Sequence, residues 1–277
     1  MIGRLPDMVS RFAGLVLLAI FSVAFEVPKA AGQEDGWQPV APGVEFRRSE
    51  HEIAGVEAPA TLAVVRADPT RTKVVVLDSY STVSREGKKY ASYSLRELKR
   101  IVGAIAVVNG GFGQSFALPV PAGLVVQDGD TISPLNRQSR TQSGVFCVNG
   151  DEAKLVNKLD YRDGACRQAL QSGPKIVEYP GENGISRPRK AFIRSVACID
   201  DAGRVLLVRS SSAALFHVAE ILRAETADGG YGCEAALNLS GDVESGMLYE
   251  ADGEDRPVGE VDSLVASAIA ILPRSAP

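Results

Sequence analysis

Three short segments end an apolar stretch in amides, hydroxyls and glycines, which are groups that can hold a sugar or a phosphate. They are Val108–Phe112 (VNGGF), Leu170–Pro174 (LQSGP) and Leu237–Gly241 (LNLSG). Amides and hydroxyls donate and accept hydrogen bonds, as sugar hydroxyls do. Glycine lets the backbone turn sharply or approach a ligand closely, because it has no Cβ. Each corner alone is typical of an ordinary turn, so their combination carries the hypothesis of a polar site.

A second candidate feature is the group of basic residues Arg187, Arg189, Lys190 and Arg194, which allows an anion site. The chain as a whole has a formal net charge of −4, and this becomes −5 without residues 1–32, which hold three basic and two acidic residues. A mildly acidic chain is a poor candidate for binding nucleic acid. We therefore expect no nucleic-acid partner.

The N-terminus has the pattern of a signal peptide. Phe12–Phe25 is an uncharged apolar run of fourteen residues that follows Arg4 and Arg11. That length suits a signal-peptide core better than a membrane span, which needs about twenty residues. Ala30–Gly32 offers small residues for cleavage before Gln33. We predict that residues 1–32 are removed and that the mature protein is periplasmic or secreted without a stable membrane span; an uncleaved anchor is the alternative.

Four cysteines, Cys147, Cys166, Cys198 and Cys233, fit two disulfides in an oxidising compartment. Of the three possible pairings we favour Cys147–Cys166, which closes a short loop, and Cys198–Cys233, which ties two apolar strands together. Buried free thiols are the alternative. The sequence has no metal-ligand spacing of cysteines and histidines, so we predict no metal site and no cofactor.

Short apolar runs separated by turn signals predict a chain dominated by strands. The runs are Thr61–Arg66, Lys73–Leu77, Ala104–Val108, Gly123–Gln127, Gly144–Val148, Ala153–Val156, Lys175–Tyr179, Phe192–Ile199, Val205–Val208 and Ala235–Leu239. Apolar residues at helical spacing predict helices over Tyr90–Val102, capped by Ser92 or Ser94, and over Leu215–Glu225. Val261–Leu272 is compatible with a strand or a short helix.

These elements favour an α+β fold with mixed or antiparallel β-sheets and a few packed helices, because the helices do not alternate regularly with the strands. The same pattern argues against a doubly wound nucleotide-binding fold. Residues 33–45 are rich in glycine, proline and acidic residues and are expected to be exposed. We predict a lead-in over residues 33–58 and a single domain over residues 59–273.

The order and content of the corners resemble the phosphodiester glycosidase domain family. The matching segments are Asn109–Phe112, Pro121–Leu124, Asp128–Gly129, Gln171–Pro174, Gly232–Gly241 and Ser245–Tyr249, with an approximate match at Arg194–Cys198, where Cys198 stands in place of the usual glycine. Together they cover roughly residues 60–250. The resemblance implies an exported hydrolase that cleaves a sugar from a glycosyl phosphodiester in the cell envelope, with a carbohydrate or glycosyl-phosphate ligand.

The resemblance also implies roles for particular residues. Arg194 would hold the phosphodiester, because a guanidinium can bond two phosphate oxygens at once; a surface salt bridge is the alternative. A carboxylate would stabilise the developing oxocarbenium charge or activate water. The expected substrate-binding residues are Asn109, Gly110, Phe112, Gln171, Ser172, Gly173, Asn238, Ser240, Gly241 and Ser245.

The chain departs from the family pattern at Ser240, where the family has the aspartate of a Leu-Asp-Gly corner. A serine cannot replace a carboxylate as a base at neutral pH. Asp242 and Glu244, two and four residues later, are therefore the candidate catalytic carboxylates. Either one of them supplies the charge from a shifted position, or the chain is an inactive relative that binds an envelope glycan or phosphoglycan.

Overall fold

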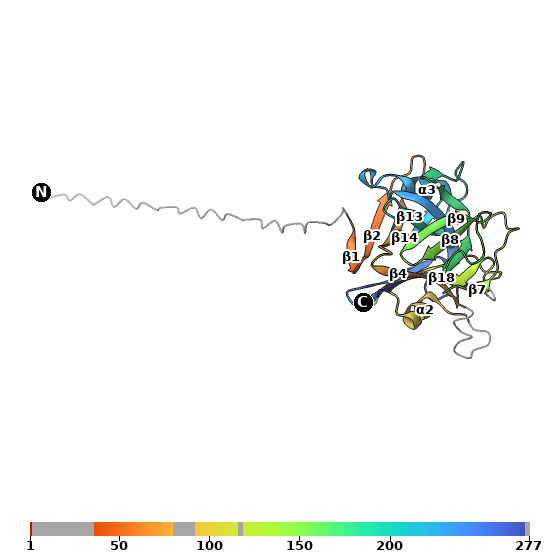
Figure 1. Cartoon of the computed structure of the whole chain (residues 1–277). Coiled ribbons are helices and arrows are strands. Elements are labelled where there is room, and N and C mark those ends of the chain that lie inside the picture. The colour runs from red at the N-terminus through yellow and green to blue at the C-terminus, as the bar shows by residue number, and fades with distance from the viewer. Residues whose placement is uncertain (2–35, 80–91, 116–118, 275–277) are drawn as a thin grey trace. The chain divides into compact units, whose positions relative to one another are not determined.

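The computed structural model describes Met1 and residues 36–79, 92–115 and 119–274, and within them it contains three antiparallel sheets (Figure 1). The first has the order β1 (Gln38–Ala41), β2 (Val44–His51), β3 (Ala60–Ala67), β14 (Val205–Ala213), β13 (Phe192–Asp200), β15 (Cys233–Gly241), β11 (Lys175–Glu178), β12 (Glu182–Asn183). The second has the order β7 (Asp130–Ser133), β6 (Val125–Gln127), β10 (Gln168–Ser172), β8 (Gly144–Asn149), β9 (Glu152–Asn157). The third has the order β17 (Glu254–Gly259), β16 (Gly246–Ala251), β5 (Ala106–Asn109), β18 (Ser267–Pro273), β4 (Thr72–Asp78).

Two α-helices, α2 (Leu95–Val102) and α3 (Leu215–Arg223), lie among the described residues. The α+β expectation is therefore corrected towards a fold richer in β-structure, with every pairing of the named strands antiparallel. The sequence pattern already shows the cause, because ten apolar runs of strand length outnumber the helical segments.

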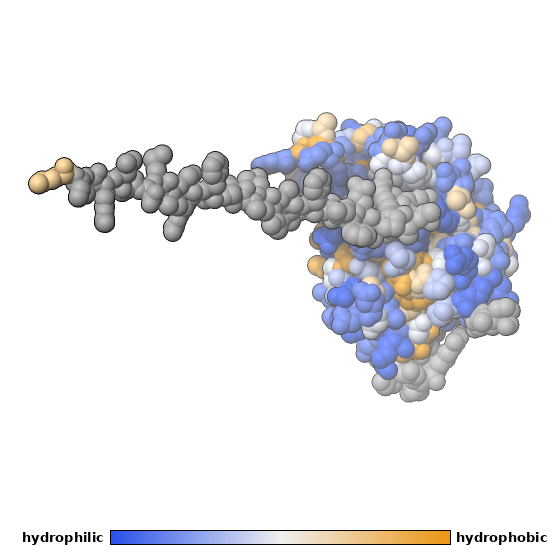
Figure 2. Space-filling view, turned by 90° about the vertical axis from the view of Figure 1, so that its left-hand side faces the viewer, coloured by the Kyte–Doolittle hydropathy of each residue, from blue (hydrophilic) through white to orange (hydrophobic). Residues whose placement is uncertain are grey.

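A central core joins all three sheets. It contains Val65 and Leu207 from the first sheet, Phe146 from the second and Ile269 from the third. The other face of the first sheet packs against α3, and the other face of the third sheet packs against α2. Figure 1 shows these helices at opposite ends of the folded unit. The face seen in Figure 2 is mostly hydrophilic around a smaller apolar area.

Helix α2 confirms the predicted capping. Ser94 is its N-cap and forms a capping box with Glu97, which satisfies backbone donors at the helix start. Gly103 ends the helix in the left-handed conformation at φ 64°, where glycine has no steric penalty. The chain then enters β5, so this helix delivers Asn109 to the end of a buried strand.

The expectation that residues 33–45 are exposed is corrected in part for those of them that the structure describes. β1 and β2 form a hairpin, and β2 pairs with β3 over its whole length. Trp37 is 3% exposed and Val44 is fully buried. The proline and glycine at positions 42 and 43 make the hairpin turn rather than a linker. The predicted signal peptide at residues 1–32 lies outside the described residues except for Met1.

The remaining predictions concern the last strand and the disulfides. Of the Val261–Leu272 segment, the part from Ser267 onward forms strand β18, which pairs with β4 and β5. Disulfides join Cys147 to Cys166 and Cys198 to Cys233, which is the favoured pairing. Among the helices of the described residues, none is long and apolar enough to cross a membrane.

Candidate functional site

The three polar corners meet at the ends of β5, β10 and β15. The Asn109 amide donates to the Ser240 carbonyl at 2.9 Å, and the Ser240 backbone N–H donates to the Gly110 carbonyl at 2.9 Å. The Asn238 amide donates to the Gly173 carbonyl at 2.9 Å. A Cβ on Gly111 would lie 2.6 Å from the Gln171 carbonyl oxygen, so glycine is required there. The structure thus brings the three corners into direct contact.

Asn109 holds this arrangement together from inside the protein. Its side-chain oxygen accepts hydrogen bonds from the Ser195 hydroxyl at 2.6 Å and from the Gly246 backbone N–H at 3.1 Å. The Ser195 hydroxyl also lies 2.8 Å from the hydroxyl of Ser245. Asn109 is only 1% exposed, so its side chain positions the neighbouring corners and does not face a cleft. Ser195 belongs to the same network, and only its place beside Arg194 in the sequence hints at that.

Gln171 has a similar internal role. Its oxygen accepts from the backbone of Leu124 and Asn136, and its amide donates to the carbonyls of Asn136 and Gln142. The next residues form a tight corner, because a Cβ on Gly173 would lie 2.1 Å from the Thr141 carbonyl oxygen. Gln171 therefore fixes the path of the second corner, and Phe112 is half-buried at the first.

Several buried polar atoms at the corners have no hydrogen-bond partner within the described part of the chain. They include the Ser172 hydroxyl, the side-chain oxygen of Asn238 and the Nε of Arg194. Unpaired buried polar atoms are rare and are costly to keep. Their concentration near the corners is typical of a functional site, where polar groups are arranged for a ligand rather than for stability.

The third corner lies next to a carboxylate. The Ser240 hydroxyl donates a hydrogen bond to the carboxylate of Glu244, which lies in the short 3-10 helix Asp242–Glu244. Asp242 begins this helix at a φ of 53°, a left-handed conformation that aspartate adopts more readily than most residues with a side chain and that turns the chain sharply. Because of this turn, Glu244 folds back onto Ser240. Asp242 itself is exposed.

Arg194 lies beside the same corner. Gly241 pairs with Arg194 across β13 and β15, and a Cβ on Gly241 would lie 3.8 Å from Nη1 of that arginine. The guanidinium carbon of Arg194 stands 4.8 Å from the centre of the Phe192 ring. Burial lowers the pKa of Arg194, and the negative charge of Asp242 raises it. An arginine remains cationic under either influence at neutral pH.

Arg194 also lines a cavity of about 620 Å³, which we call the basic pocket. The residues that line it come from the loop before β8, the turn between β10 and β11, the loop between β12 and β13, the start of β13 and the start of α3. Its cationic members are Arg140, Arg187, Arg189, Lys190 and Arg194, and its remaining members are Thr141, Pro174, Gly184, Ile185, Ser186, Phe192, Leu215 and Phe216. Four of the five cations are those that the sequence singles out as an anion site. Arg140 was missed, since nothing near it in sequence connects it to the others.

The fold is similar to that of several solved structures. The catalytic domain of zebrafish N-acetylglucosamine-1-phosphodiester alpha-N-acetylglucosaminidase, auto-inhibited by its pro-peptide, has a TM-score of 0.65 at 14% identity, over 87% of this chain and 87% of that chain. A hypothetical protein from Synechocystis has a TM-score of 0.58 at 14% identity, over 84% and 62%. A putative exported protein from Burkholderia pseudomallei has a TM-score of 0.53 at 12% identity, over 80% and 76%.

The chain therefore shares its fold with one sugar-phosphodiester hydrolase and with two proteins of no stated activity. The sequence match is more specific, because residues 102–272 match the family model of the phosphodiester glycosidases. The chain therefore belongs to the phosphodiester glycosidase family. No curated protein matches its sequence.

Proposed function

We propose that the chain is an exported hydrolase that cleaves a sugar from a glycosyl phosphodiester, with Glu244 supplying the carboxylate. Membership of the phosphodiester glycosidase family supports the reaction class. The observation that carries the assignment is the hydrogen bond from the Ser240 hydroxyl to the Glu244 carboxylate. It puts an acidic group at the corner where the aspartate of the family pattern is replaced by serine.

In this proposal Arg194 binds the phosphodiester anion through two parallel hydrogen bonds. The bond between the sugar's anomeric carbon and the phosphate oxygen breaks, and a phosphate monoester leaves with the bonding electrons. Its low basicity makes strong acid assistance unnecessary. A water molecule adds to the anomeric carbon and gives a proton to Glu244, which also stabilises the positive charge that develops on the sugar.

Ser240 acts as a positioning residue in this scheme. Its hydroxyl donates to Glu244, and its backbone is held by Asn109 and Gly110 from β5. The Glu244 carboxylate is thereby fixed relative to the first corner. This matters because a small displacement of a reacting group can lower the reaction rate strongly. Asn109 and Gln171 contribute by fixing the corners, since their side chains bond to protein groups.

The decisive test uses the mature protein and a sugar 1-phosphodiester with a methyl or aryl aglycone. Glu244→Gln removes the carboxylate with little change in shape and should lower kcat by about 100-fold or more. Glu182→Gln is the matched control, because Glu182 is exposed on the edge strand β12. An active parent whose rate survives Glu244→Gln would remove Glu244 from the mechanism.

Replacement of the family aspartate by Ser240 favours a second candidate, an inactive relative that binds a glycan or phosphoglycan. Ser240→Asp separates the two. If the parent is inactive and the variant hydrolyses the diester, the chain is an inactive relative. If the parent is active and the variant is slower, the proposal that Glu244 supplies the catalytic carboxylate is supported, because the added aspartate would repel Glu244. A parent and a variant that both fail on a panel of sugar phosphodiesters would count against the hydrolase.

The export part of the proposal is supported by the two disulfides, which are typical of oxidising compartments, and by the signal-peptide pattern before Gln33. Cell fractionation and N-terminal sequencing of the recovered protein test it. We expect envelope or medium fractions and a mature N-terminus at Gln33. Full-length protein in the cytoplasm would contradict it.

A further inference from the structure

The charges of the basic pocket are unbalanced. Five cationic side chains line it and no carboxylate does. Within the residues that the structure describes, Arg140, Arg187, Arg189 and Lys190 have no ion-pair partner. The chain as a whole has a formal net charge of −4. A concentration of unpaired positive charge in an acidic protein opposes its own folding through like-charge repulsion, so stability does not account for it.

The walls of the pocket strengthen its positive potential. Ile185, Phe192, Leu215 and Phe216 present apolar surface between the cations. A cleft with low-dielectric walls and charges of one sign focuses the electric field and raises the local concentration of counter-ions. Leu215 and Phe216 are also the first two residues of α3, whose N-cap has no side-chain hydrogen bond and whose first turn has no acidic residue. The partial positive charge of that helix end adds to the cations.

The pocket shares residues with the proposed catalytic site. Arg194 belongs to both, and Pro174 follows the second corner directly. A simple phosphodiester carries one negative charge, which Arg194 alone can match. The other four cations would then remain without a counter-charge. A ligand with more than one negative group would match the charge of the whole pocket.

We propose that the basic pocket is a subsite for a second phosphate-type group of the substrate, on the side of the diester away from the cleaved sugar. Arg140, Arg187, Arg189 and Lys190 bind this group, while Arg194 binds the diester. The substrate class is therefore a glycosyl phosphodiester whose aglycone carries at least one further phosphate. The position of this subsite in a substrate rests on the proposed function, whereas the preference of the pocket for multiply charged anions does not.

The first test is calorimetric and requires no catalysis. Inorganic pyrophosphate and inorganic phosphate are titrated into the mature protein at low salt. We expect pyrophosphate to bind about tenfold more tightly, and Arg187→Ala/Arg189→Ala to lower its affinity by about tenfold or more. Arg71→Ala is the matched control, because Arg71 is an exposed arginine of another pocket, and it should leave the affinity within about twofold. Equal binding of the two anions, or a double variant that binds like the parent, would overturn the inference.

The second test compares turnover of two sugar 1-phosphodiesters, one with a methyl aglycone and one whose aglycone carries an additional phosphate. We expect about a tenfold lower KM for the phosphorylated substrate, and loss of that preference in Arg187→Ala/Arg189→Ala. Turnover of both substrates without a preference would overturn the inference while leaving the hydrolase intact. Failure to turn over either substrate would count against the proposed function, and the calorimetry would still decide the anion subsite.

Discussion

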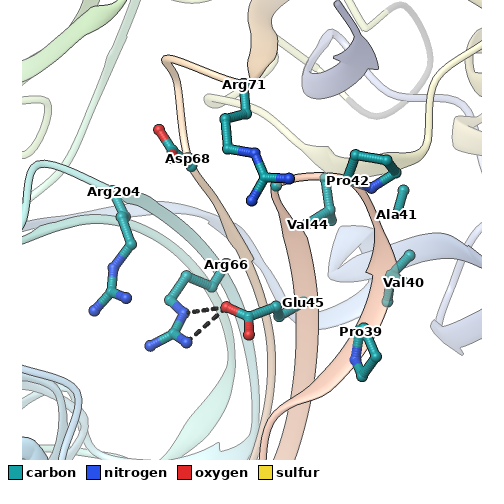
Figure 3. Close-up of a pocket in the computed structure, with 11 residues that line it drawn as sticks. Pro39, Val40, Ala41, Pro42, Val44, Glu45, Arg66, Asp68, Arg71 and Arg204 are labelled. Carbon is teal, nitrogen blue, oxygen red and sulfur yellow. Dashed lines mark hydrogen bonds and ion pairs between the residues drawn. The ribbon is translucent and has the colours of Figure 1, made fainter. Parts of the chain in front are cut away.

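Two pockets of the folded unit are rich in arginine, and they differ in what faces the arginines. The pocket in Figure 3, of about 510 Å³, is lined by Arg66, Arg71 and Arg204 together with Glu45 and Asp68. We call it the paired pocket, because its buried cation is matched by a carboxylate: Nε and Nη2 of Arg66 donate to Glu45 at 2.9 and 2.6 Å. The basic pocket has more cations and no carboxylate.

The difference separates arginines that are paired inside the fold from arginines that have no ion-pair partner among the described residues. Arg66 is 4% exposed and its guanidinium lies 4.0 Å from the centre of the Trp37 ring, so it stabilises the packing of the first sheet. Arg187 and Arg189 are exposed and, in the part of the chain that the structure describes, they form no ion pair. The number of arginines in a pocket is therefore a weaker indication of anion binding than the absence of carboxylates that pair with them.

The largest effect is expected from Arg194→Ala in the basic pocket. This change removes the group that we propose binds the diester, so turnover of a sugar phosphodiester should fall by about 100-fold to 1000-fold. Steady-state kinetics measure it, with Arg71→Ala from the paired pocket as the control. Because Arg194 contacts Phe192, urea unfolding of the variant should be followed in parallel. A folded variant with the parent's rate would remove Arg194 from the site.

The next effect is on stability and concerns the paired pocket. Glu45→Gln removes the carboxylate that accepts two hydrogen bonds from the buried guanidinium of Arg66, and the loss of a charged partner at a buried site is costly. We expect the free energy of unfolding to fall by about 2–3 kcal/mol, measured by urea denaturation. Glu254→Gln breaks an exposed pair with Arg256 at 3.1 Å and should cost less than about 1 kcal/mol. Equal losses in the two variants would mean that burial does not distinguish these pairs.

The sequence predicts most of the strands and the polar corners, because both depend on local patterns. The runs Thr61–Arg66 and Lys73–Leu77 become β3 and β4, and Ser94 caps α2. The hairpin of β1 and β2 was missed, since β1 is only four residues long and contains a proline, and β2 is rich in charged residues. Its position in the sheet depends on long-range pairing with β3, which local propensity does not reveal.

The candidate site is predictable only in part for the same reason. The three corners are visible in the sequence, and their contacts are not, because residues such as Asn109 and Ser240 are far apart along the chain. In the sequence Glu244 is four residues from Ser240. The structure shows that the left-handed conformation of Asp242 turns the chain so that the Glu244 side chain reaches the Ser240 hydroxyl. Arg140 joins the basic pocket from a separate loop.

The paired pocket should also impose a pH dependence on stability. Arg204 bonds to Asp200 at 2.7 Å. Burial raises the pKa of Asp200, and the hydrogen bond and charge of Arg204 lower it. Arg204→Ala removes the opposing influence, so the pKa of Asp200 in the folded protein should rise further above its unfolded value. A raised carboxyl pKa gives a contribution to stability that is present at low pH and is lost as the pH rises through the folded pKa.

The stability deficit of Arg204→Ala relative to the parent should therefore grow between about pH 4 and pH 7, reaching about 1–2 kcal/mol. Urea denaturation at a series of pH values measures it. In the Asp200→Asn background the titrating group is absent, and the effect of Arg204→Ala should be independent of pH. A deficit that is constant across this range in the parent background would show that Asp200 does not carry the dependence.

The smallest expected effect on stability comes from making the basic pocket resemble the paired one. Ser186 is exposed and lines the basic pocket, so Ser186→Glu brings a carboxylate among the unpaired arginines. Exposed ion pairs contribute little, and the free energy of unfolding should change by less than about 0.5 kcal/mol. The affinity for pyrophosphate should nevertheless fall about fivefold at low salt, because the new carboxylate competes for the cations, and the difference should shrink at high salt as charges are screened. Ser186→Gln has the same length without the charge and should keep the parent's affinity. If both variants bind pyrophosphate as the parent does, the absence of a carboxylate is not what distinguishes the two pockets.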